Sequence, residues 1–245
     1  MKHMCTGFTD VGLKREVNQD AVFMKSDGNN GLFAVADGMG GHSHGEFASA
    51  TIRDCLALWW DSFSPEYYEK DFTRMMLSLN QILEKANVDI RNSTPPGEIC
   101  GSTVVVIFIY EDKYGMLTAG DSRVYTVEKR KIRQISVDET WENQPGNNLS
   151  PWAKMKHPNY GKLVNAIGSS DNFRLTSRTD LLKKGMIFVL CSDGIYKYAD
   201  SKFLTKTLKH LSAARVQESL KKIRDNVYEN GAKDNMSIVV VVIYE

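Results

Sequence analysis

The sequence predicts a fold of the α+β class, or a layered α/β sandwich, in which antiparallel sheets are covered by helices. Three observations predict it. Four β-rich runs follow one another in the centre of the 245-residue chain, joined by turns too short for parallel crossovers. Two long helical patterns precede these runs. Another helical pattern separates two apolar runs near the C-terminus.

The N-terminal part of the chain predicts one buried strand and two helices. The strand is Gly31–Ala36, an apolar run bounded by glycine. A helix is expected over about residues 46–63, where apolar side chains recur at helical spacing. Ser64 followed by Pro65 is typical of an N-cap and a first-turn proline, so a second helix is expected from there to about Asn92.

The rest of the chain predicts a sheet with one excursion and one helix. An antiparallel meander is expected from Thr103–Tyr110, Gly115–Ala119, Arg123–Val127 and Ile132–Ile135. Residues 138–160 are polar and contain proline, so they are predicted to leave the sheet. Met186–Cys191 and Ser237–Ile243 predict buried strands on either side of a helix over Ser212–Tyr228. The last strand is apolar on both faces, which predicts an interior position.

Composition excludes several functional classes. Hydrophobic residues make up 42% and charged residues 25%, and the net charge is +1, so neither nucleic acid nor a membrane surface is an expected partner. No apolar run approaches the ~20 residues of a membrane span. The first ten residues contain no apolar core of signal-peptide length, so we expect a cytoplasmic protein without membrane insertion. The basic run Lys129–Arg133 is interpreted as a solvated hairpin turn.

Five aspartates attract attention because of where they stand: four of them lie at predicted strand ends and three have a glycine neighbour. They are Asp20, Asp37, Asp121, Asp193 and Asp234. Carboxylates brought together repel one another unless cations neutralise them, and oxygen ligands suit Mg²⁺ or Mn²⁺. Two such ions could activate water and clamp a phosphoryl group, which Arg15 could contact. From the residues alone, phosphate-ester hydrolysis and simple Asp-Gly turns both remain open.

The order of seven segments then resembles a known family, the type 2C metal-dependent Ser/Thr protein phosphatases, and its compact bacterial branch in particular. The segments are GLKREVNQD (12–20), VADGMGGHSHGEFAS (35–49), GSTVVV (101–106), TAGDSRVY (118–125), KHPNYGKLVNAIG (156–168), VLCSDGIYKY (189–198) and AKDNMSIVVV (232–241). The resemblance implies a single catalytic domain over residues 1–245. Its fold would be a four-layer α/β/β/α sandwich with two central antiparallel sheets flanked by helices. A flap would span about residues 139–170.

The resemblance also implies a role for each site residue, carried over position by position. Asp37 would bridge two Mn²⁺ or Mg²⁺ ions, and Gly38 would ligate one through its carbonyl. Further ligands would be Asp193 and Asp234, with Asp20 holding metal-bound water and Asp121 helping to bind a third, weaker ion. Arg15 would bind the substrate phosphate.

The implied reaction is hydrolysis of phosphoserine and phosphothreonine on proteins without a phosphoenzyme, by direct attack of a metal-bound water on phosphorus. The implied partners are phosphorylated proteins, among them a cognate Ser/Thr kinase and its substrates, and the enzyme is expected to be a monomer. The alternative is a catalytically silent member that serves as a regulatory binding module. The complete set of aspartates argues against that alternative.

Three departures from the family pattern concern the site. Gln19 stands where a glutamate is frequent, so one carboxylate beside the metal-bound water is missing. Met39 replaces a histidine that animal relatives offer as a general acid, as is common in bacterial members. In the flap, Trp152 and Ala153 stand where acidic residues are usual, so substrate preference is expected to differ there.

Other chemistries fit the sequence less well. His42 and His44 have a spacing that could suggest zinc, but zinc needs three or four ligands and the other histidines are scattered. We expect helix-start or neighbouring roles for them, with His42 nearer the rim of the site. No cysteine has the arginine six residues later that a cysteine phosphatase requires, and the glycines form neither GxGxxG nor a P-loop. The four cysteines are expected to be free thiols.

Overall fold

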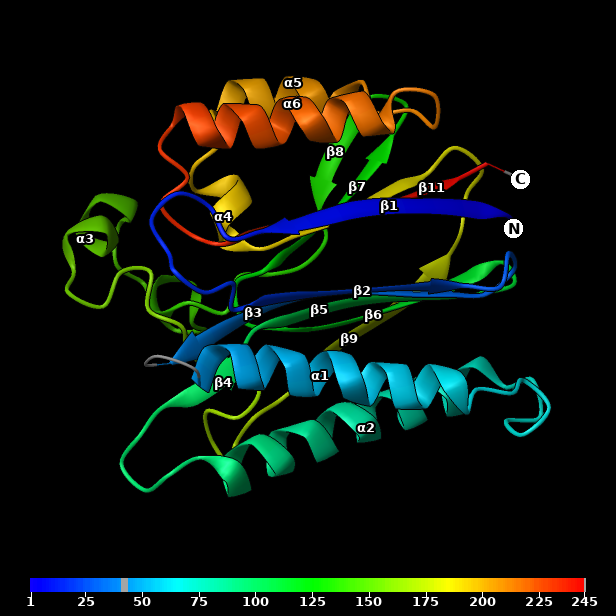
Figure 1. Ribbon diagram of the computed structural model, residues 1–245, viewed down its shortest axis with the longest axis horizontal. Coiled ribbons are helices and arrows are strands. Elements are labelled where there is room, and N and C mark those ends of the chain that lie inside the picture. The colour runs from blue at the N-terminus through cyan, green and yellow to red at the C-terminus, as the bar shows by residue number, and fades with distance from the viewer. Residues whose placement is uncertain (41–43, 245) are drawn as a thin grey trace.

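In the computed structural model, which describes residues 1–40 and 44–244, two antiparallel sheets face each other in the middle of the molecule (Figure 1). One sheet has the strand order β1 (His3–Asp10), β11 (Met236–Ile243), β10 (Ile187–Cys191), β7 (Arg123–Glu128) and β8 (Lys131–Gln134). The other has the order β2 (Asp20–Ser26), β3 (Gly31–Gly40), β5 (Val104–Tyr110), β6 (Lys113–Ala119) and β9 (Thr176–Leu181). The short β4 (Cys100–Ser102) pairs with the end of β3.

Helices cover the outer face of each sheet. Helices α1 (His44–Asp61) and α2 (Phe72–Ser93) cover the outer face of the β2–β9 sheet, and α5 (Ser201–Lys209) and α6 (Val216–Glu229) cover that of the β1–β8 sheet (Figure 1). Three short helices, η1 (Trp141–Asn143), α3 (Pro151–Lys156) and α4 (Asp193–Tyr196), lie at one end of the sandwich. The predicted α/β/β/α architecture is confirmed.

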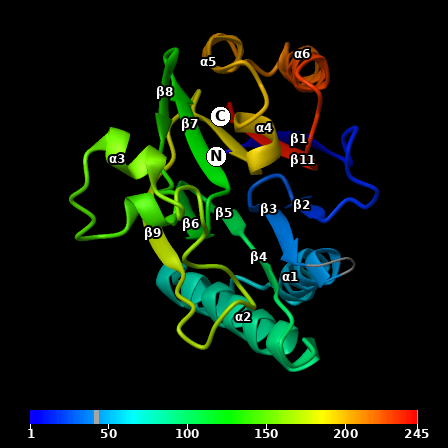
Figure 2. The ribbon, with the colours of Figure 1, turned by 90° about the vertical axis from the view of Figure 1, so that its left-hand side faces the viewer.

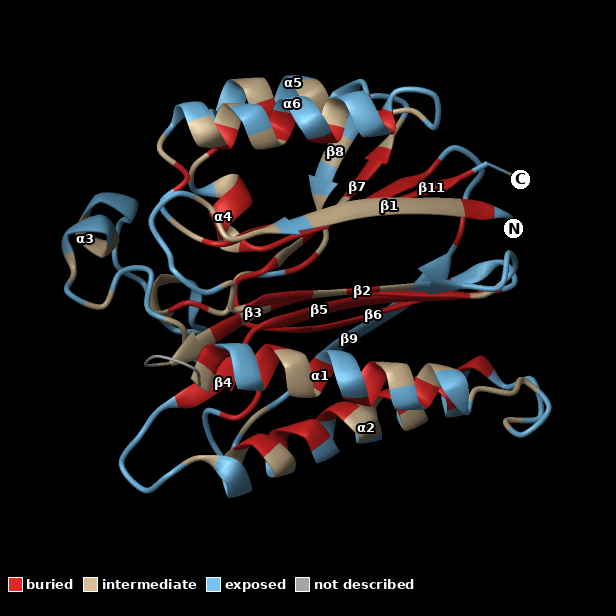
Figure 3. Cartoon of the chain, in the orientation of Figure 1, coloured by how far each residue is buried: buried red, intermediate tan, exposed pale blue. Residues whose placement is uncertain are grey.

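Buried apolar residues form three clusters between the four layers. Figure 3 marks buried residues in red along the strands of both sheets and on the helices that cover them. Phe33, Val105 and Phe188 belong to the layer between the sheets, and all three are fully buried. Burying one such side chain stabilises the fold by about 1.5–3 kcal/mol. Strand β11 is buried on both faces and lies between β1 and β10, as its continuous apolar sequence predicts. These layers make the strand ends rigid points of attachment for functional side chains.

The second helix begins later than the sequence suggests, so the prediction of an N-cap at Ser64 is wrong. Residues after Pro65 form turns, and both Glu69 and Lys70 have positive φ angles, of 54° and 56°. Asp71 is the N-cap: its carboxylate accepts hydrogen bonds from the backbone N–H of Thr73 and of Arg74. A better cap seven residues downstream therefore sets the start of the helix.

The four central strands exist, but the prediction that they form one meander is wrong. β5 and β6 form a hairpin in one sheet, and β7 and β8 form a hairpin in the other. The turn Gly120–Ser122 carries the chain from one sheet to the other, and Gly120 adopts a φ of +96° there. The Ser122 hydroxyl contacts the hydroxyl of Thr103 at 2.7 Å, which fixes this turn against β5. A short turn is equally compatible with a hairpin and with such a corner.

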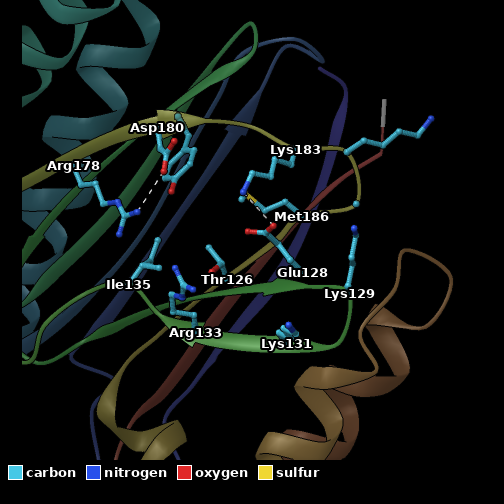
Figure 4. A pocket seen from close by; sticks show the side chains of 13 residues that line it. Thr126, Glu128, Lys129, Lys131, Arg133, Ile135, Arg178, Asp180, Lys183 and Met186 are labelled. Atoms are coloured by element: carbon cyan, nitrogen blue, oxygen red, sulfur yellow. Dashed lines mark hydrogen bonds and ion pairs between the residues drawn. The ribbon is translucent and has the colours of Figure 1, made fainter.

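Two further segments bear on the sequence predictions. Strand β3 extends to Gly40, so Asp37 lies within the strand and not after it, because β4 pairs with residues 38–40. The basic run forms the predicted β7–β8 hairpin. It lines a hollow of about 690 Å³ together with Arg178, Lys183 and Lys184 (Figure 4). Among the described residues, no helix is both long enough and apolar enough to cross a membrane.

Candidate metal centre

The predicted site residues come together at the end of the sandwich that carries α3 and α4 (Figure 2). Asp20 at the start of β2 pairs directly with Asp37 on β3. Asp193 opens α4 just after β10, and Asp234 stands two residues before β11. Asp121 lies in the turn between the sheets. A pocket of about 540 Å³ is lined by Arg15, Asp37, Gly38, Asp121, Asp193 and Asp234, and Asp20 is buried beside it.

Asp20 is the aspartate of this group whose surroundings favour a bound cation most clearly. The Ser192 hydroxyl donates to its Oδ2 at 2.7 Å, but its buried Oδ1 has no hydrogen-bond partner in the described part of the chain. Burial raises the pKa of Asp20 to about 7, and repulsion from Asp193 and Asp234 adds to the shift, although the Ser192 bond opposes it. An unpaired buried carboxylate oxygen is costly, so a bound ion or its water would satisfy it.

Asp37 lines the pocket beside Asp20 and is held by its backbone. Its N–H donates to the Thr103 hydroxyl at 3.2 Å, and its carbonyl accepts from the Thr103 N–H at 2.9 Å. These bonds leave the carboxylate as the group that faces the pocket. Burial raises the pKa of Asp37 well above its ordinary value, and the charges of Asp20 and Asp193 raise it further. This is the electrostatic setting in which a hard divalent cation binds.

The glycines that follow Asp37 and Asp193 have a packing role that sequence reasoning missed. A Cβ atom on Gly38 would collide with the backbone carbonyl of Gly45 in the first turn of α1. A Cβ atom on Gly194 would collide with the backbone carbonyl of Asn235. Glycine at these positions therefore lets separate segments approach the two aspartates closely.

Arg15 lies at the site, as predicted, but it is paired with a predicted metal ligand. Its Nε is 2.9 Å from Oδ1 of Asp234, and its Nη2 is 3.0 Å from Oδ2, a bidentate ion pair. Its side chain is half exposed. Asn235 fixes the Arg15 loop in place: its Nδ2 donates to the carbonyls of Val11 and Val17, each at 3.0 Å. The Asp-Asn pair in AKDNMS was the sequence signal for this anchor.

Lys197 is a site residue that the sequence reading did not identify. Its Nζ lies 2.7 Å from Oδ2 of Asp193 and 3.3 Å from Oδ2 of Asp121. The neighbouring Tyr196 hydroxyl also donates to Asp121, at 3.0 Å to the carbonyl and 3.2 Å to Oδ2. Burial raises the pKa of Asp121, and the charge of Lys197 opposes this shift. The only signal was a lysine one turn after the aspartate of SDG.

The flap borders the pocket through its C-terminal half. Gly161, Lys162 and Leu163 line the pocket. The Oε2 of Glu139 accepts from the backbone N–H of Gly120 at 2.9 Å, which ties the flap to the residue before Asp121. Trp152 does not line the pocket and its side chain points largely into solvent.

The histidine pair of the opening motif is only partly placed. His44 starts α1 and pairs with Glu98, with 3.0 Å between Nδ1 and Oε2, and it does not line the pocket. The expected rim position of His42 lies outside the described residues. The described histidine therefore serves a helix start and not the carboxylate cluster.

The carboxylate and carbonyl oxygens of the predicted site residues are the kind of donor that two hard divalent ions would take. The side chains do not stand in a finished coordination shell. Among the described residues, no three His, Cys, Asp or Glu side chains stand in an assembled metal arrangement. Arg15 and Lys197 instead hold Asp234 and Asp193 in ion pairs. Four carboxylates and three cations, Arg15, Lys162 and Lys197, line the pocket, and the buried Asp20 beside it has an oxygen without a hydrogen-bond partner among the described residues, which fits a bound cation.

Comparison with known proteins agrees with this geometry. A sequence profile described as protein phosphatase 2C matches residues 13–224. The Ser/Thr protein phosphatase PstP of Mycobacterium tuberculosis is 27% identical over 97% of this chain, and the chain spans 44% of that protein's length. Protein phosphatase PhpP of Streptococcus pneumoniae is 26% identical, over 97% of this chain and 96% of PhpP.

Solved structures share the whole fold. PppA of Pseudomonas aeruginosa superposes with a TM-score of 0.82 at 26% identity, over 98% of this chain and 97% of PppA. The catalytic domain of PstP, solved in complex with two manganese ions, superposes with a TM-score of 0.78 at 23% identity. That match covers 100% of this chain and 99% of that domain.

Proposed function

The chain belongs to the protein phosphatase 2C family, and on that premise we propose that it hydrolyses phosphoserine and phosphothreonine on proteins. The observation that carries the proposal is the convergence of five aspartates at one end of the sandwich, where Asp20 keeps an unpartnered buried oxygen. The names of PstP and PhpP, both protein phosphatases, support the same substrate class.

The proposed centre holds two Mn²⁺ or Mg²⁺ ions between the strand ends. Asp37, Asp193, Asp234 and the carbonyl of Gly38 would hold them, and Asp20 would accept a hydrogen bond from water in the same shell. The two manganese ions in the PstP catalytic domain support this metal choice. The chemistry that such a pair supplies is activation of a water for direct attack on phosphorus and neutralisation of phosphoryl oxygens.

The protein's own groups then orient the substrate. Arg15 lies on the rim of the pocket with a half-exposed guanidinium, which suits bidentate binding of a phosphate monoester. To bind the phosphate, Arg15 would have to release the Asp234 carboxylate. This would follow when Asp234 ligates a metal ion. Met39 lines the pocket and its side chain has no acidic proton, so the leaving alkoxide takes its proton from water or from another group.

The pocket favours a protein substrate over a small metabolite. Its lining includes the apolar side chains of Ile99 and of Leu163 in the flap. An extended phosphopeptide can lie between them with its phosphate at Arg15. A cytoplasmic, monomeric enzyme of one catalytic domain that opposes a Ser/Thr kinase remains part of this proposal, with the flap setting substrate preference.

The test is a metal-dependent hydrolysis assay on the purified protein. Wild type with Mn²⁺ is expected to hydrolyse p-nitrophenyl phosphate and phosphoserine or phosphothreonine peptides. EDTA and Asp193→Asn are each expected to abolish turnover. If wild type releases no more phosphate than Asp193→Asn on all of these substrates, the enzyme proposal fails and a silent binding module replaces it.

A further inference from the structure

Lys197 bridges two carboxylates that come from different parts of the chain. Asp121 belongs to the turn between β6 and β7, and Asp193 opens α4. The ammonium lies 3.3 Å from the first and 2.7 Å from the second, so it sits between them. The sequence resemblance gives Asp121 a role in holding a third metal ion, yet a positive charge of the protein already lies beside that carboxylate.

The fold holds Lys197 in this place. Its backbone N–H donates to the carbonyl of Asp193 at 2.9 Å, closing the single turn of α4. The preceding Tyr196 is fixed on both sides: its hydroxyl bonds to Asp121, and the Arg123 guanidinium lies 3.5 Å from its ring centroid. Oδ2 of Asp121 therefore accepts from both Tyr196 and Lys197, and its side chain is only 6% exposed.

The paired carboxylate Asp193 can serve a metal and Lys197 at the same time. Its Oδ2 bonds to the lysine, and its Oδ1 is the second oxygen through which it could ligate a metal. Asp234 differs, because Arg15 occupies both of its oxygens. A metal at Asp234 must displace the guanidinium, which can swing away on a half-exposed side chain. A metal at Asp193 displaces nothing.

We propose that Lys197 is a tethered cation that takes the position of a third metal ion between Asp121 and Asp193, so that this enzyme binds two ions and not three. An ammonium is a compact point charge with three donors, so it can neutralise two carboxylates at once. A divalent ion beside it would face both repulsion and an oxygen already engaged. The inference rests on the proposed two-ion centre.

Manganese stoichiometry of the purified full chain tests the inference without any measurement of activity. Free and bound Mn²⁺ are separated by equilibrium dialysis and quantified by electron paramagnetic resonance. Wild type is expected to saturate at two ions per chain, and Lys197→Ala at three, because the Asp121–Asp193 pair becomes vacant. Asp121→Asn in the Lys197→Ala background is expected to return the count to two.

Two further variants make the result specific. Lys221→Ala removes the same charge from the exposed face of α6 and is expected to leave two ions bound. Lys197→Gln removes the charge while keeping a long side chain, and it replaces Lys197→Ala if that variant fails to fold. A merely structural role for Lys197 would lower the melting temperature of its variants without adding an ion.

The possible outcomes separate this inference from the proposed function. Three ions in wild type, or two in every folded Lys197 variant, would overturn the tethered cation and leave the two-ion phosphatase standing. No bound Mn²⁺ in natively folded wild type would overturn both. Two ions in wild type and three in Lys197→Ala, lost again with Asp121→Asn, are the results expected.

Discussion

At the scale of single residues, the electrostatics of the site depend on the repulsion among neighbouring carboxylates and on the few cationic side chains that pair with them. Asp20 and Asp37 are buried and close to other aspartates, so burial and repulsion both disfavour their ionised forms. Arg15 and Lys197 relieve part of that repulsion from the rim. Variants of these two side chains should separate metal binding from phosphate binding.

Replacing Arg15 with alanine should weaken substrate binding without weakening metal binding. A lost charge-assisted contact to phosphate corresponds to about a tenfold or larger rise in KM. Because the arginine occupies Asp234 in the metal-free protein, Mn²⁺ affinity should stay equal or increase. Steady-state kinetics on a phosphopeptide and calorimetric Mn²⁺ titration measure the two effects, with Arg53→Ala as the surface control. Loss of Mn²⁺ binding would contradict the assigned role.

Asp20 predicts a pH dependence of stability in the metal-free protein. Its pKa rises from an ordinary value near 4 when unfolded to about 7 in the fold. Its stabilising contribution is therefore complete below about pH 4 and is lost as pH rises through 7. The loss amounts to at most ~1.4 kcal/mol per pH unit.

Urea unfolding in EDTA at pH 5 and pH 7.5 tests this directly. The free energy of unfolding of Asp20→Asn minus that of wild type should be larger at pH 7.5, because only wild type has a carboxylate to ionise. Saturating Mn²⁺ should remove the pH dependence. A difference that is the same at both pH values would show that Asp20 does not titrate in this range.

The site residues that can be predicted from the sequence alone are those marked by a local sequence pattern. Four of the five candidate aspartates stand at predicted strand ends and three have a glycine neighbour, and all five lie at one end of the fold. Ser192, Asn235 and Lys197 could not be assigned, because their roles depend on which side chain reaches across from another segment. The roles of these three residues depend on distances in the folded chain, and neither the spacing of residues in the sequence nor the composition contains those distances.

At the scale of elements, the hydrophobic pattern of the sequence predicts most of the helices and strands. The residues at which these elements begin and end, and the strands that pair with each other, depend on competing local signals. The short turn at Gly120 predicts a hairpin, but in the structure it connects β6 of one sheet to β7 of the other. Strand β9 is exposed along its whole length and α5 is short, so neither has an apolar run that would reveal it. Strand β3 was cut short at its glycines because β4 could not be foreseen.

The start of α2 offers a direct test of which cap sets the helix. Asp71→Ala removes the carboxylate that accepts from two backbone N–H groups and should cost about 1 kcal/mol of unfolding free energy. Ser64→Ala is the matched control, since the Ser64 hydroxyl donates to the exposed Glu66 carboxylate and caps no helix, so stability should change by less than ~0.5 kcal/mol. Urea denaturation measures both. The reverse order would restore the helix start that the sequence suggests.

At the scale of the whole molecule, the sandwich separates a stable body from a site that is costly without metal. The three apolar layers hold the strand ends in place, and the strand ends hold the carboxylates together. The opposite end carries the basic hollow of Figure 4, where Lys183 pairs with Glu128 and Arg178 with Asp180. Bound metal should therefore stabilise the entire fold through the sheets that position its ligands.

Metal binding should raise the melting temperature, because ions that bind the folded state alone stabilise it by mass action. At a free concentration one hundred times the dissociation constant, one site contributes about 2.7 kcal/mol, or roughly 5–10 °C for a domain of this size. Differential scanning fluorimetry of EDTA-treated protein across a Mn²⁺ series should show that rise in wild type. Asp37→Asn should lose most of it, because Asp37 lines the pocket and is one of the proposed ligands of the ions. Asp61→Asn, an exposed aspartate at the end of α1, should respond like wild type. A Mn²⁺-induced rise equal in wild type and Asp37→Asn would place the stabilising ions elsewhere on the molecule.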